Sequence, residues 1–329
     1  MTQQSAEEQA ARPFPNWRRL LLNLVNAAAV APLGLFVFSL LGRYYYFAEL
    51  VCNFRVQILI MLIPFIFVAV GTRRWILSGF LLIAIGWSMI GTIWVFLPGV
   101  QPDAGPTKLK IMSYNVLAPN TNHSEVAEQI LDSEPDFVSI LEYSLNWHQA
   151  LDCLDEIYPY QVTVPRWHGF GIAIFSKYPI SQTKVIQLTK QSTDNPLIVT
   201  NVAFGDQTIR IAALHVLSPT NRYRLDLRNQ QFVEVANAVS NQEIPTIVMG
   251  DFNCTPWSPF LTDFARDTGY RDSRRGFGYQ GTWPADQWIT RIPIDHAFVS
   301  ADIHVHSRLV GPRSGSDHLP IILEVSTAK

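Results

Sequence analysis

The segment MGDFN at 249–253 holds an acidic and an amide side chain at a fixed spacing behind an apolar run. Residues 244–249 are mostly β-branched and apolar, which predicts a buried strand. Gly250 permits the turn that carries Asp251 and Asn253 out of the end of the sheet together. A carboxylate and an amide side by side can orient a nucleophile and hydrogen-bond a phosphate oxygen. Because Asp-x-Asn after a strand is also an ordinary turn, the meaning of this segment depends on its companions elsewhere.

Further polar residues lie at the ends of, or within, short frames that resemble strands or strand-to-loop junctions. They are Asn115, Glu142, His215, Asp295, Asp317 and His318. Taken singly, each is more often structural: an asparagine at a strand end caps a turn, and a lone histidine is packed or solvated. Their ordered recurrence instead favours one shared site that the fold assembles.

With these residues in view, the chain resembles the endonuclease/exonuclease/phosphatase superfamily. The resemblance covers nearly all of residues 108–326, and its elements occur in the order of the family. They are the strand end Tyr114-Asn115, Glu142, GFGIAIFSKYPI at 169–180, His215, GDFN at 250–253, IDH at 294–296 and SDH at 316–318. The TWP sequence at 282–284, together with an apolar N-terminal region, is similar to a membrane-anchored bacterial branch of that superfamily.

The resemblance implies an α/β fold, a four-layer α/β sandwich with the site at one end of two packed sheets. Glu142 would be the principal metal carboxylate, with Asn115 and Asp317 nearby in the metal sphere. Oxygen ligands of this kind suit Mg²⁺ or Mn²⁺, and no Cys/His cluster with zinc spacing competes with them. Bound metal would polarise a phosphoryl oxygen during in-line attack.

The same resemblance implies catalytic roles for five residues. Asp295 would pair with His318, which would either activate water or stabilise the transferring phosphoryl group. Asp251 would orient or deprotonate the attacking water, Asn253 would hold a phosphate oxygen, and His215 would supply another hydrogen bond to the phosphate. No residue is assigned to substrate recognition. His296 should point to the opposite face of its strand and be structural.

Strands and a few helices are predicted to position these residues in a catalytic domain at 108–329. The predicted strands are 109–116, 137–141, 171–175, 198–204, 208–215, 246–249, 294–299 and 321–325, and a later strand carries His304 and His306, which look solvated. The predicted helices are 124–133 and 225–240. A strand-rich sequence without a repeating βαβ unit favours a fold of packed sheets flanked by helices.

Three long apolar runs before this domain predict three transmembrane helices at 20–97. The runs are 20–41, 54–70 and 76–97; the second is marginal in length and contains Pro64. Basic residues precede the first run and fill the link between the second and third, which favours a cytoplasmic segment 1–19 and an extracytoplasmic (periplasmic) catalytic domain. A stiff Pro/Gly linker at 98–107 joins the two parts. A multi-pass cell-membrane protein is therefore expected.

Charge and cysteine content narrow the function further. Residues after 100 hold 18 basic and 24 acidic side chains, a net charge of −6, which argues mildly against tight binding of duplex nucleic acid. The three cysteines lack zinc spacing, and a bridge between Cys153 and Cys254 stays open. Basic residues at 271, 274 and 275 favour a solvated loop, with phosphate or headgroup contact as the alternative. One of Arg222, Arg224 and Arg228 could reach substrate.

The expected function is a membrane-anchored, metal-dependent phosphoester hydrolase, with diester hydrolysis favoured over monoester. The substrate could be a nucleic acid, a phospholipid or a nucleotide; the bilayer is the other partner, and no protein partner is inferred. A catalytically inactive membrane scaffold is the alternative, but none of the site positions departs from the family pattern. A metal-free Ser-His-Asp hydrolase lacks a G-x-S-x-G nucleophile elbow.

Overall fold

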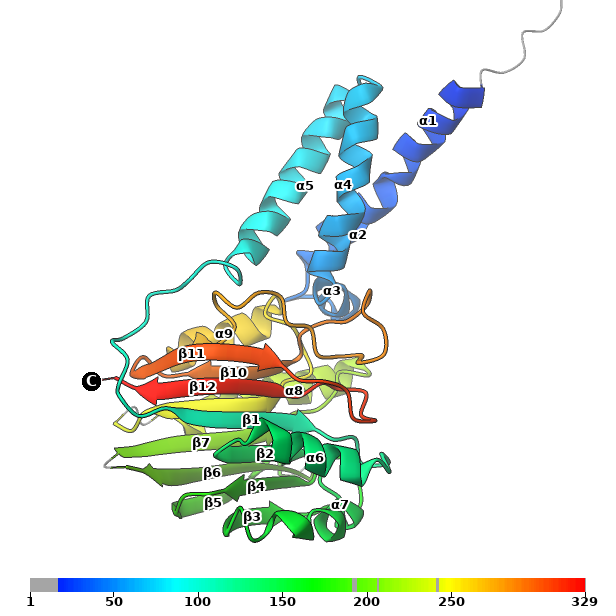
Figure 1. Cartoon of the computed structure of the whole chain (residues 1–329). Coiled ribbons are helices and arrows are strands. Elements are labelled where there is room, and N and C mark those ends of the chain that lie inside the picture. Colours follow the sequence, from blue (N-terminus) through cyan, green and yellow to red (C-terminus); the bar gives the residue numbers. More distant parts are fainter. Residues whose placement is uncertain (1–16, 191–193, 206, 241–242, 329) are drawn as a thin grey trace, which may run out of the picture.

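Apolar helices form a stalk on a β-rich body in the computed structural model, which describes residues 17–190, 194–205, 207–240 and 243–328 (Figure 1). The predicted segment 1–19 lies almost wholly outside the described residues. The stalk helices are α1 (Trp17–Ala28), α2 (Val30–Ser39), α3 (Tyr46–Cys52), α4 (Arg55–Gly71) and α5 (Trp75–Ile93). From α5 the chain runs along the side of the body to the first strand.

Two stalk helices are long and apolar enough to cross a membrane, and a third span is counted if a bent pair is taken as one. The first is Trp17–Ser39, which comprises α1 and α2 and has 23 residues, and the second is Trp75–Ile93, which is α5 and has 19 residues. The predicted second run forms α4, whose 17 residues include Pro64. It reaches the length of a span only together with α3, from which it is bent by 72°. No sequence pattern predicted α3.

The body contains two six-stranded mixed sheets. One has the order β11-β12-β1-β2-β4-β3, with β11 (Ile303–Val310), β12 (Ile321–Thr327), β1 (Leu109–Asn115), β2 (Phe137–Leu141), β4 (Ile172–Ser176) and β3 (Tyr160–Val164). The other has the order β5-β6-β7-β8-β10-β9, with β5 (Ile180–Leu188), β6 (Asn195–Phe204), β7 (Gln207–His215), β8 (Thr246–Asp251), β10 (Asp295–Val299) and β9 (Arg271–Asp272). Within each sheet one central pair is parallel, β1 with β2 and β7 with β8.

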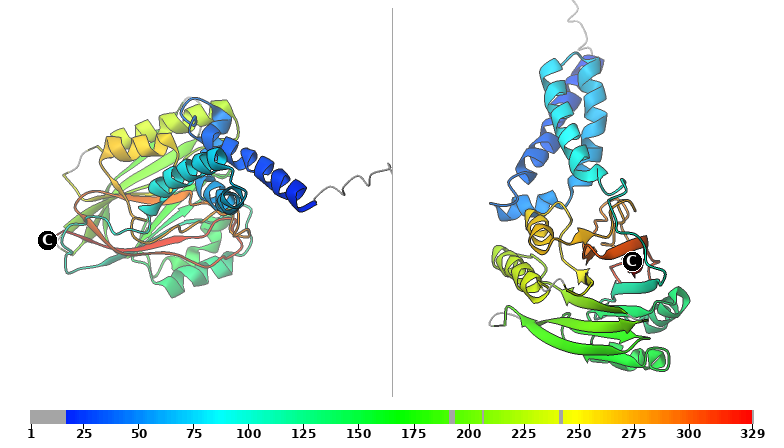
Figure 2. Two further views of the ribbon diagram at one scale, coloured as in Figure 1. Left: turned by 90° about the horizontal axis from the view of Figure 1, so that it is seen from above. Right: turned by 90° about the vertical axis from the view of Figure 1, so that its left-hand side faces the viewer.

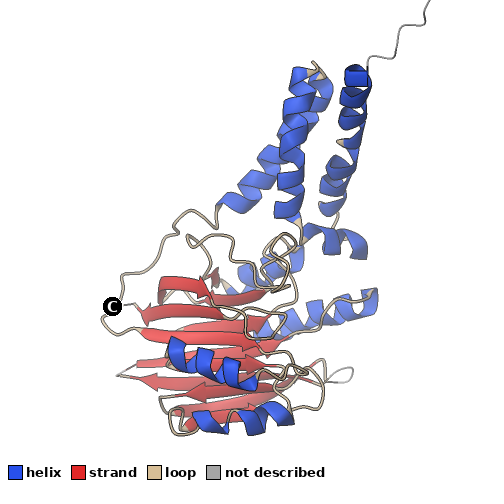
Figure 3. Cartoon of the chain, turned by 45° about the vertical axis from the view of Figure 1, so that its right-hand side comes forward, coloured by secondary structure: helices blue, strands red, loops and turns tan. Residues whose placement is uncertain are grey.

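Helices cover the outer face of each sheet, so the body has four layers (Figures 2 and 3). Buried side chains such as Ile111 and Ile211 fill the space between the sheets. α6 (His123–Ser133) and α7 (Leu145–Ala150) pack on the first sheet through Ile130 and Trp147. α8 (Arg222–Ala238) and α9 (Pro259–Thr268) pack on the second through residues that include Phe232. This is the predicted four-layer α/β sandwich.

Every predicted strand and both predicted helices of the body are present, with ends shifted by at most three residues. The elements that sequence analysis missed are β3, β5, β9, α7 and α9. β5 is an edge strand whose middle residues are exposed, so it lacks the apolar alternation that marks a strand. The short helices α7 and α9 are held by local contacts, such as the hydrogen bond from Trp147 N to Ser144 Oγ at 3.3 Å.

The structure answers the question of the cysteine bridge that the sequence left open, and it shows that one expectation about two histidines was wrong. Cys153 is exposed and Cys254 is buried, and both are free thiols, so no bridge joins them. His304 and His306 are half-buried rather than solvated; His304 Nδ1 lies 2.8 Å from Pro102 O, and His306 Nε2 lies 2.9 Å from Ser326 Oγ. The chain segment that leads to the body covers this edge of β11, which the strand pattern could not reveal.

Candidate active site

The strands that carry the polar residues end at one edge of the body. Asn115 is the last residue of β1, and Glu142 directly follows the neighbouring parallel strand β2. In the other sheet His215 ends β7, pairs in register with Asp251 of the parallel strand β8, and Asp251 pairs with Asp295 of β10. Parallel neighbours present their carboxyl ends at the same edge, so the side chains of both sheets converge there.

Backbone conformation at this edge is unusual at three site positions. Gly250 has φ +144°, and a Cβ there would lie 1.9 Å from Leu214 O, so only glycine fits between β7 and β8. Glu142 and Asn253 have φ values of +60° and +49°, in the left-handed region that non-glycine residues avoid. Such conformations persist only where the surroundings enforce them, and they are concentrated at functional sites.

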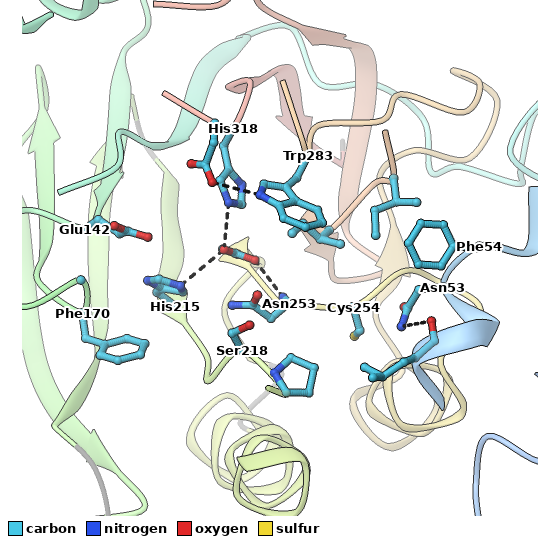
Figure 4. Close-up of a pocket in the computed structure, with 17 residues that line it drawn as sticks. Asn53, Phe54, Glu142, Phe170, His215, Ser218, Asn253, Cys254, Trp283 and His318 are labelled. Atoms are coloured by element: carbon cyan, nitrogen blue, oxygen red, sulfur yellow. Dashed lines mark hydrogen bonds and ion pairs between the residues drawn. The ribbon is translucent and has the colours of Figure 1, made fainter. Parts of the chain in front are cut away.

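Asp251 is the centre of the cluster. Its Oδ1 accepts a hydrogen bond from Asn253 N at 2.8 Å. Its Oδ2 accepts one from Asn115 Nδ2 at 3.2 Å, and lies 3.4 Å from His215 Nε2 and 3.6 Å from His318 Nε2 (Figure 4). Four of the other seven predicted site residues therefore surround the buried carboxylate of Asp251.

Asp295 and His318 form the predicted pair. His318 Nδ1 donates to Asp295 Oδ2 at 2.9 Å, and both side chains are buried. Burial lowers the pKa of His318, but the negative charges of Asp295 and Asp251 outweigh it and raise that pKa to about 10. Burial raises the pKa of Asp251 to about 6, although the charge of His318 opposes the rise. At neutral pH the cluster therefore holds an imidazolium between carboxylates.

Asn115 links this cluster to Glu142. Its Nδ2 also donates to Glu142 Oε1 at 3.2 Å, and its Oδ1 accepts from Leu117 N at 3.1 Å. The second carboxylate oxygen of Glu142 accepts from Ala118 N at 2.9 Å. The amide of Asn115 is thus a hydrogen-bonded bridge between two carboxylates.

Asp317 has an unsatisfied carboxylate oxygen at the cleft. Its Oδ2 accepts from Trp283 Nε1 at 3.0 Å, whereas its buried Oδ1 has no hydrogen-bond partner within the part of the chain that the structure describes. Asp317 and Glu142 both line one cleft of ≈ 510 Å³. A buried carboxylate oxygen without a donor is costly, and a hard cation would satisfy it. The donor set therefore fits an oxygen-ligated divalent metal.

A second grouping also has metal-like spacing. Ligand atoms of Asp251, Asp295 and His318 lie within 4.8 Å of one another. This set differs from the predicted ligands Asn115, Glu142 and Asp317. His318 already hydrogen-bonds Asp295 and forms an ion pair with Asp251 at 3.6 Å, and a protonated His318 has no lone pair to offer a cation. We therefore regard the open oxygen of Asp317 as the better mark of a metal position.

Two other predicted residues lie on the cleft wall. Asn253 uses one N–H of its Nδ2 to donate to Val216 O at 2.9 Å, and the same nitrogen carries a second N–H. His215 Nδ1 is buried with no partner among the residues that the structure describes, and its ring lies 5.0 Å from the ring of Phe170. His296 faces away from this cluster, as predicted: it is fully buried between Arg274 Nη2 and Cys254 O, each 2.8 Å from a ring nitrogen.

Three basic residues near the site, Arg224, Arg228 and Arg274, make structural contacts. Arg274 is fully buried and pairs with Asp272 at 2.5 Å, so the expectation of a solvated loop was wrong there. Arg228 is fully buried and pairs with Glu49 at 2.8 Å. Arg224 Nε donates to Ser218 O at 2.9 Å. The acidic partner of Arg228 lies 179 positions away in the sequence, so spacing alone could not assign this arginine.

Sequence analysis missed the contribution of the stalk to this site. Leu50, Asn53 and Phe54 line the same cleft as Asp251 and His318. One signal was available: Glu49 is the only acidic residue between positions 9 and 100. An isolated acid in apolar sequence implies a buried partner, and that partner is Arg228.

Comparisons with known proteins agree with this architecture. Residues 112–318 match the sequence model described as the Endonuclease/Exonuclease/phosphatase family. Among curated proteins, none matches this sequence significantly.

Solved structures share the fold at low sequence identity. The human Nocturnin catalytic domain with bound sulfate anion is 20% identical with a TM-score of 0.57, covering 67% of this chain and 95% of that chain. D. rerio TDP2 complexed with single strand DNA product is 17% identical with a TM-score of 0.57, covering 67% and 100%. Truncated Caenorhabditis elegans TDP2 is 16% identical with a TM-score of 0.55, covering 67% and 98%.

Proposed function

Because the chain belongs to the endonuclease/exonuclease/phosphatase family and is a hydrolase of phosphoester bonds, we propose that it is a membrane-anchored, divalent-metal-dependent phosphodiesterase. The observation that carries this proposal is the convergence of Asn115, His215, Asn253 and His318 on the buried carboxylate of Asp251. Positioned donors and acceptors of this kind suit in-line attack of water on phosphorus without a covalent enzyme intermediate.

Charge states favour particular roles for Asp251 and His318. With a pKa of about 6, Asp251 is ionised at neutral pH, so it can orient the attacking water and accept its proton. With a pKa of about 10, His318 keeps its proton and stabilises the negative charge on the transferring phosphoryl group. Asp295 fixes the orientation of the imidazolium through the bond to Nδ1. The second N–H of Asn253 and the ring of His215 would hold phosphate oxygens.

Glu142 and Asp317 would hold Mg²⁺ or Mn²⁺, with Asn115 alongside. The open Oδ1 of Asp317 and the all-oxygen character of the carboxylates support this choice. When bound, such an ion supplies charge that polarises a phosphoryl oxygen. Asn115 keeps Glu142 and Asp251 at a fixed separation through its two hydrogen bonds.

The stalk would anchor the enzyme in the cell membrane. Trp17–Ser39, the bent pair of α3 and α4, and Trp75–Ile93 would make three crossings, which correspond to the predicted unit 20–97. Arg18 and Arg19 in the first turn of α1, and Arg73 and Arg74 between α4 and α5, favour a cytoplasmic N-terminus. The catalytic domain 108–329 would then face the periplasm.

The proposal is tested by hydrolysis of bis(p-nitrophenyl) phosphate by the full-length protein in detergent, with and without Mg²⁺. We expect turnover that EDTA abolishes, that Mg²⁺ or Mn²⁺ restores, and that Glu142→Ala removes. Glu128→Ala, an exposed glutamate on α6, is the matched control. Activity that resists EDTA would refute the metal requirement. A folded protein with no metal-dependent turnover would favour the inactive scaffold.

A further inference from the structure

We infer that the site acts on a membrane amphiphile, a phosphoester whose phosphate lies at Asp251 and whose hydrocarbon lies along α3 of the stalk. This inference rests on the proposed function and names its substrate class. The observations behind it are the docking of α3 on the catalytic loops, the apolar stalk side of the cleft, and the character of the exposed residues around it.

The helix α3 is bonded directly to the loops that follow the catalytic strands. Tyr46 Oη donates to Pro219 O at 2.9 Å, in the loop that follows His215. Asn53 Oδ1, at the end of α3, accepts from Thr255 N at 2.7 Å, two residues after Asn253. Each contact joins a residue of the stalk to a loop that directly follows a site residue in the chain.

A buried ion pair extends this connection to the main chain of a site residue. Glu49 Oε1 accepts from Arg228 Nη2 at 2.8 Å and from Ser258 Oγ at 2.9 Å. Arg228 Nη1 in turn donates to Asn253 O at 3.2 Å. Both charged side chains are fully buried. The stalk is therefore part of the structure that holds the site, and not only a tether.

The cleft is polar at one end and apolar at the other. Figure 4 shows Glu142 and Phe170 at one end and Asn53 and Phe54, on the stalk, at the other. Leu50, Phe54, Ile292 and Ile294 supply apolar lining, whereas Asp251 and His318 supply the charged part. A molecule that fills this cleft must carry a phosphate and an apolar part at once.

The residues that line the cleft also argue against a polyanionic substrate. None of the described residues that line the cleft is lysine or arginine. Proteins that track a nucleic-acid backbone neutralise successive phosphates with such side chains. One phosphate, held beside Asp251 and His318, suits this cleft better than a chain of phosphates.

Residues beside the cleft have the character of a membrane–water interface. The helix α3 forms the body-side end of the crossing that it makes together with α4, and because it is bent by 72° from α4, it would turn toward the bilayer surface there. Tyr44 and Phe47 are each 68% exposed beside or on α3. Gln57 of α4 donates to Arg291 O at 3.2 Å, and Trp288, in the same loop as Arg291, is 79% exposed. Exposed aromatic residues are typical of the headgroup region, so the cleft would open beside the lipids.

The test compares two esters with the same reactive group, p-nitrophenyl hexadecyl phosphate and p-nitrophenyl methyl phosphate. The full-length protein is assayed with Mg²⁺ in vesicles of phosphatidylglycerol and phosphatidylcholine. The measured quantity is the ratio of kcat/KM for the hexadecyl ester to that for the methyl ester. We expect Leu50→Ala/Phe54→Ala to lower this ratio roughly tenfold, because two apolar contacts to the chain are lost.

Leu145→Ala/Val233→Ala, which shortens two exposed apolar side chains outside the cleft, is the control and should leave the ratio unchanged. The single variant Phe54→Ala alters a residue that is already 36% exposed, so it tests the same contact if the double variant is unstable. An unchanged ratio in a folded Phe54→Ala variant would overturn the inference.

The inference and the proposed function fail in different ways. In one outcome, hydrolysis depends on Glu142, but a single-stranded oligonucleotide is cleaved with a higher kcat/KM than the hexadecyl ester. The inference of an amphiphilic substrate is then wrong, whereas the proposed phosphodiesterase activity is retained. If neither ester nor the oligonucleotide is hydrolysed, the proposed function fails, and the inference with it.

Discussion

His318 donates from Nδ1 to Asp295 Oδ2 at 2.9 Å, while its other ring nitrogen faces Asp251 at 3.6 Å. The ring therefore has a carboxylate on each side, one from each of two neighbouring strands. This arrangement keeps the imidazole charged and points its second N–H toward the residue expected to hold the attacking water.

Removal of this ring should abolish catalysis without unfolding the protein. We expect His318→Ala to lower kcat by about 10² to 10⁴, a range typical of losing one positioned acid, base or charged donor. The measurement is kcat on bis(p-nitrophenyl) phosphate beside the thermal midpoint. His304→Ala, at a half-buried histidine outside the cleft, is the control. A folded His318→Ala variant with normal turnover would remove His318 from the mechanism.

The plot of kcat against pH should have an acidic limb and an alkaline limb. Asp251 must be ionised to accept a proton, so kcat should rise through about pH 6. His318 must be protonated to donate, so kcat should fall through about pH 10. Burial alone would lower the pKa of His318, and Asp295 supplies the largest opposing effect, so Asp295→Asn should move the alkaline limb to lower pH. A pH profile of Asp295→Asn that keeps the alkaline limb in place would contradict this account.

Asp317 should control metal affinity more than stability. Its buried Oδ1 has no hydrogen-bond partner among the described residues, so Asp317→Asn removes charge from a group that only a cation would satisfy. We expect the Mg²⁺ concentration for half-maximal activity to rise about 10- to 100-fold. Asp302→Asn, at an exposed aspartate, provides the comparison. Unaltered Mg²⁺ dependence would place the ion elsewhere, for instance among Asp251, Asp295 and His318.

The buried pair of Glu49 and Arg228 should respond asymmetrically to substitution. Glu49→Leu leaves an uncompensated guanidinium in the interior, which costs about 3–5 kcal/mol of unfolding free energy. Glu49→Leu/Arg228→Met removes both charges and should recover most of the loss. Thermal melting in detergent checks the two variants against the parent. Equal destabilisation by the single and double variants would show that packing, rather than charge, governs this junction.

Much of the body could be predicted from sequence because its central strands are buried, β-branched runs. The run at 246–249 begins β8, and the two residues after it extend the strand to Asp251. Polar residues at the ends of such runs had to meet once the sheets packed. The edge strand β5, with exposed residues such as Val185, carries no such signal, because half-exposed positions tolerate any polar residue.

The stalk side of the site could not be predicted in this way. Leu50 and Phe54 belong to a region whose apolar character the prediction of membrane spans already accounts for, so nothing in their sequence marks them as lining a cleft. Their position depends on the bend between α3 and α4 and on the pairing of Glu49 with a residue 179 positions later. Contacts over such separations are set by tertiary packing and leave no local pattern.

The ion pair between α3 and α8 also bears on how such an enzyme could be regulated in the cell. If a protease cut the linker near Pro102, the freed body would lose the counter-charge of Arg228, and that guanidinium bonds to the main chain of Asn253. Release from the membrane and loss of activity would then be a single event. A shed catalytic domain would be an inert product, and degradation of soluble phosphoesters far from the bilayer would not follow from proteolysis.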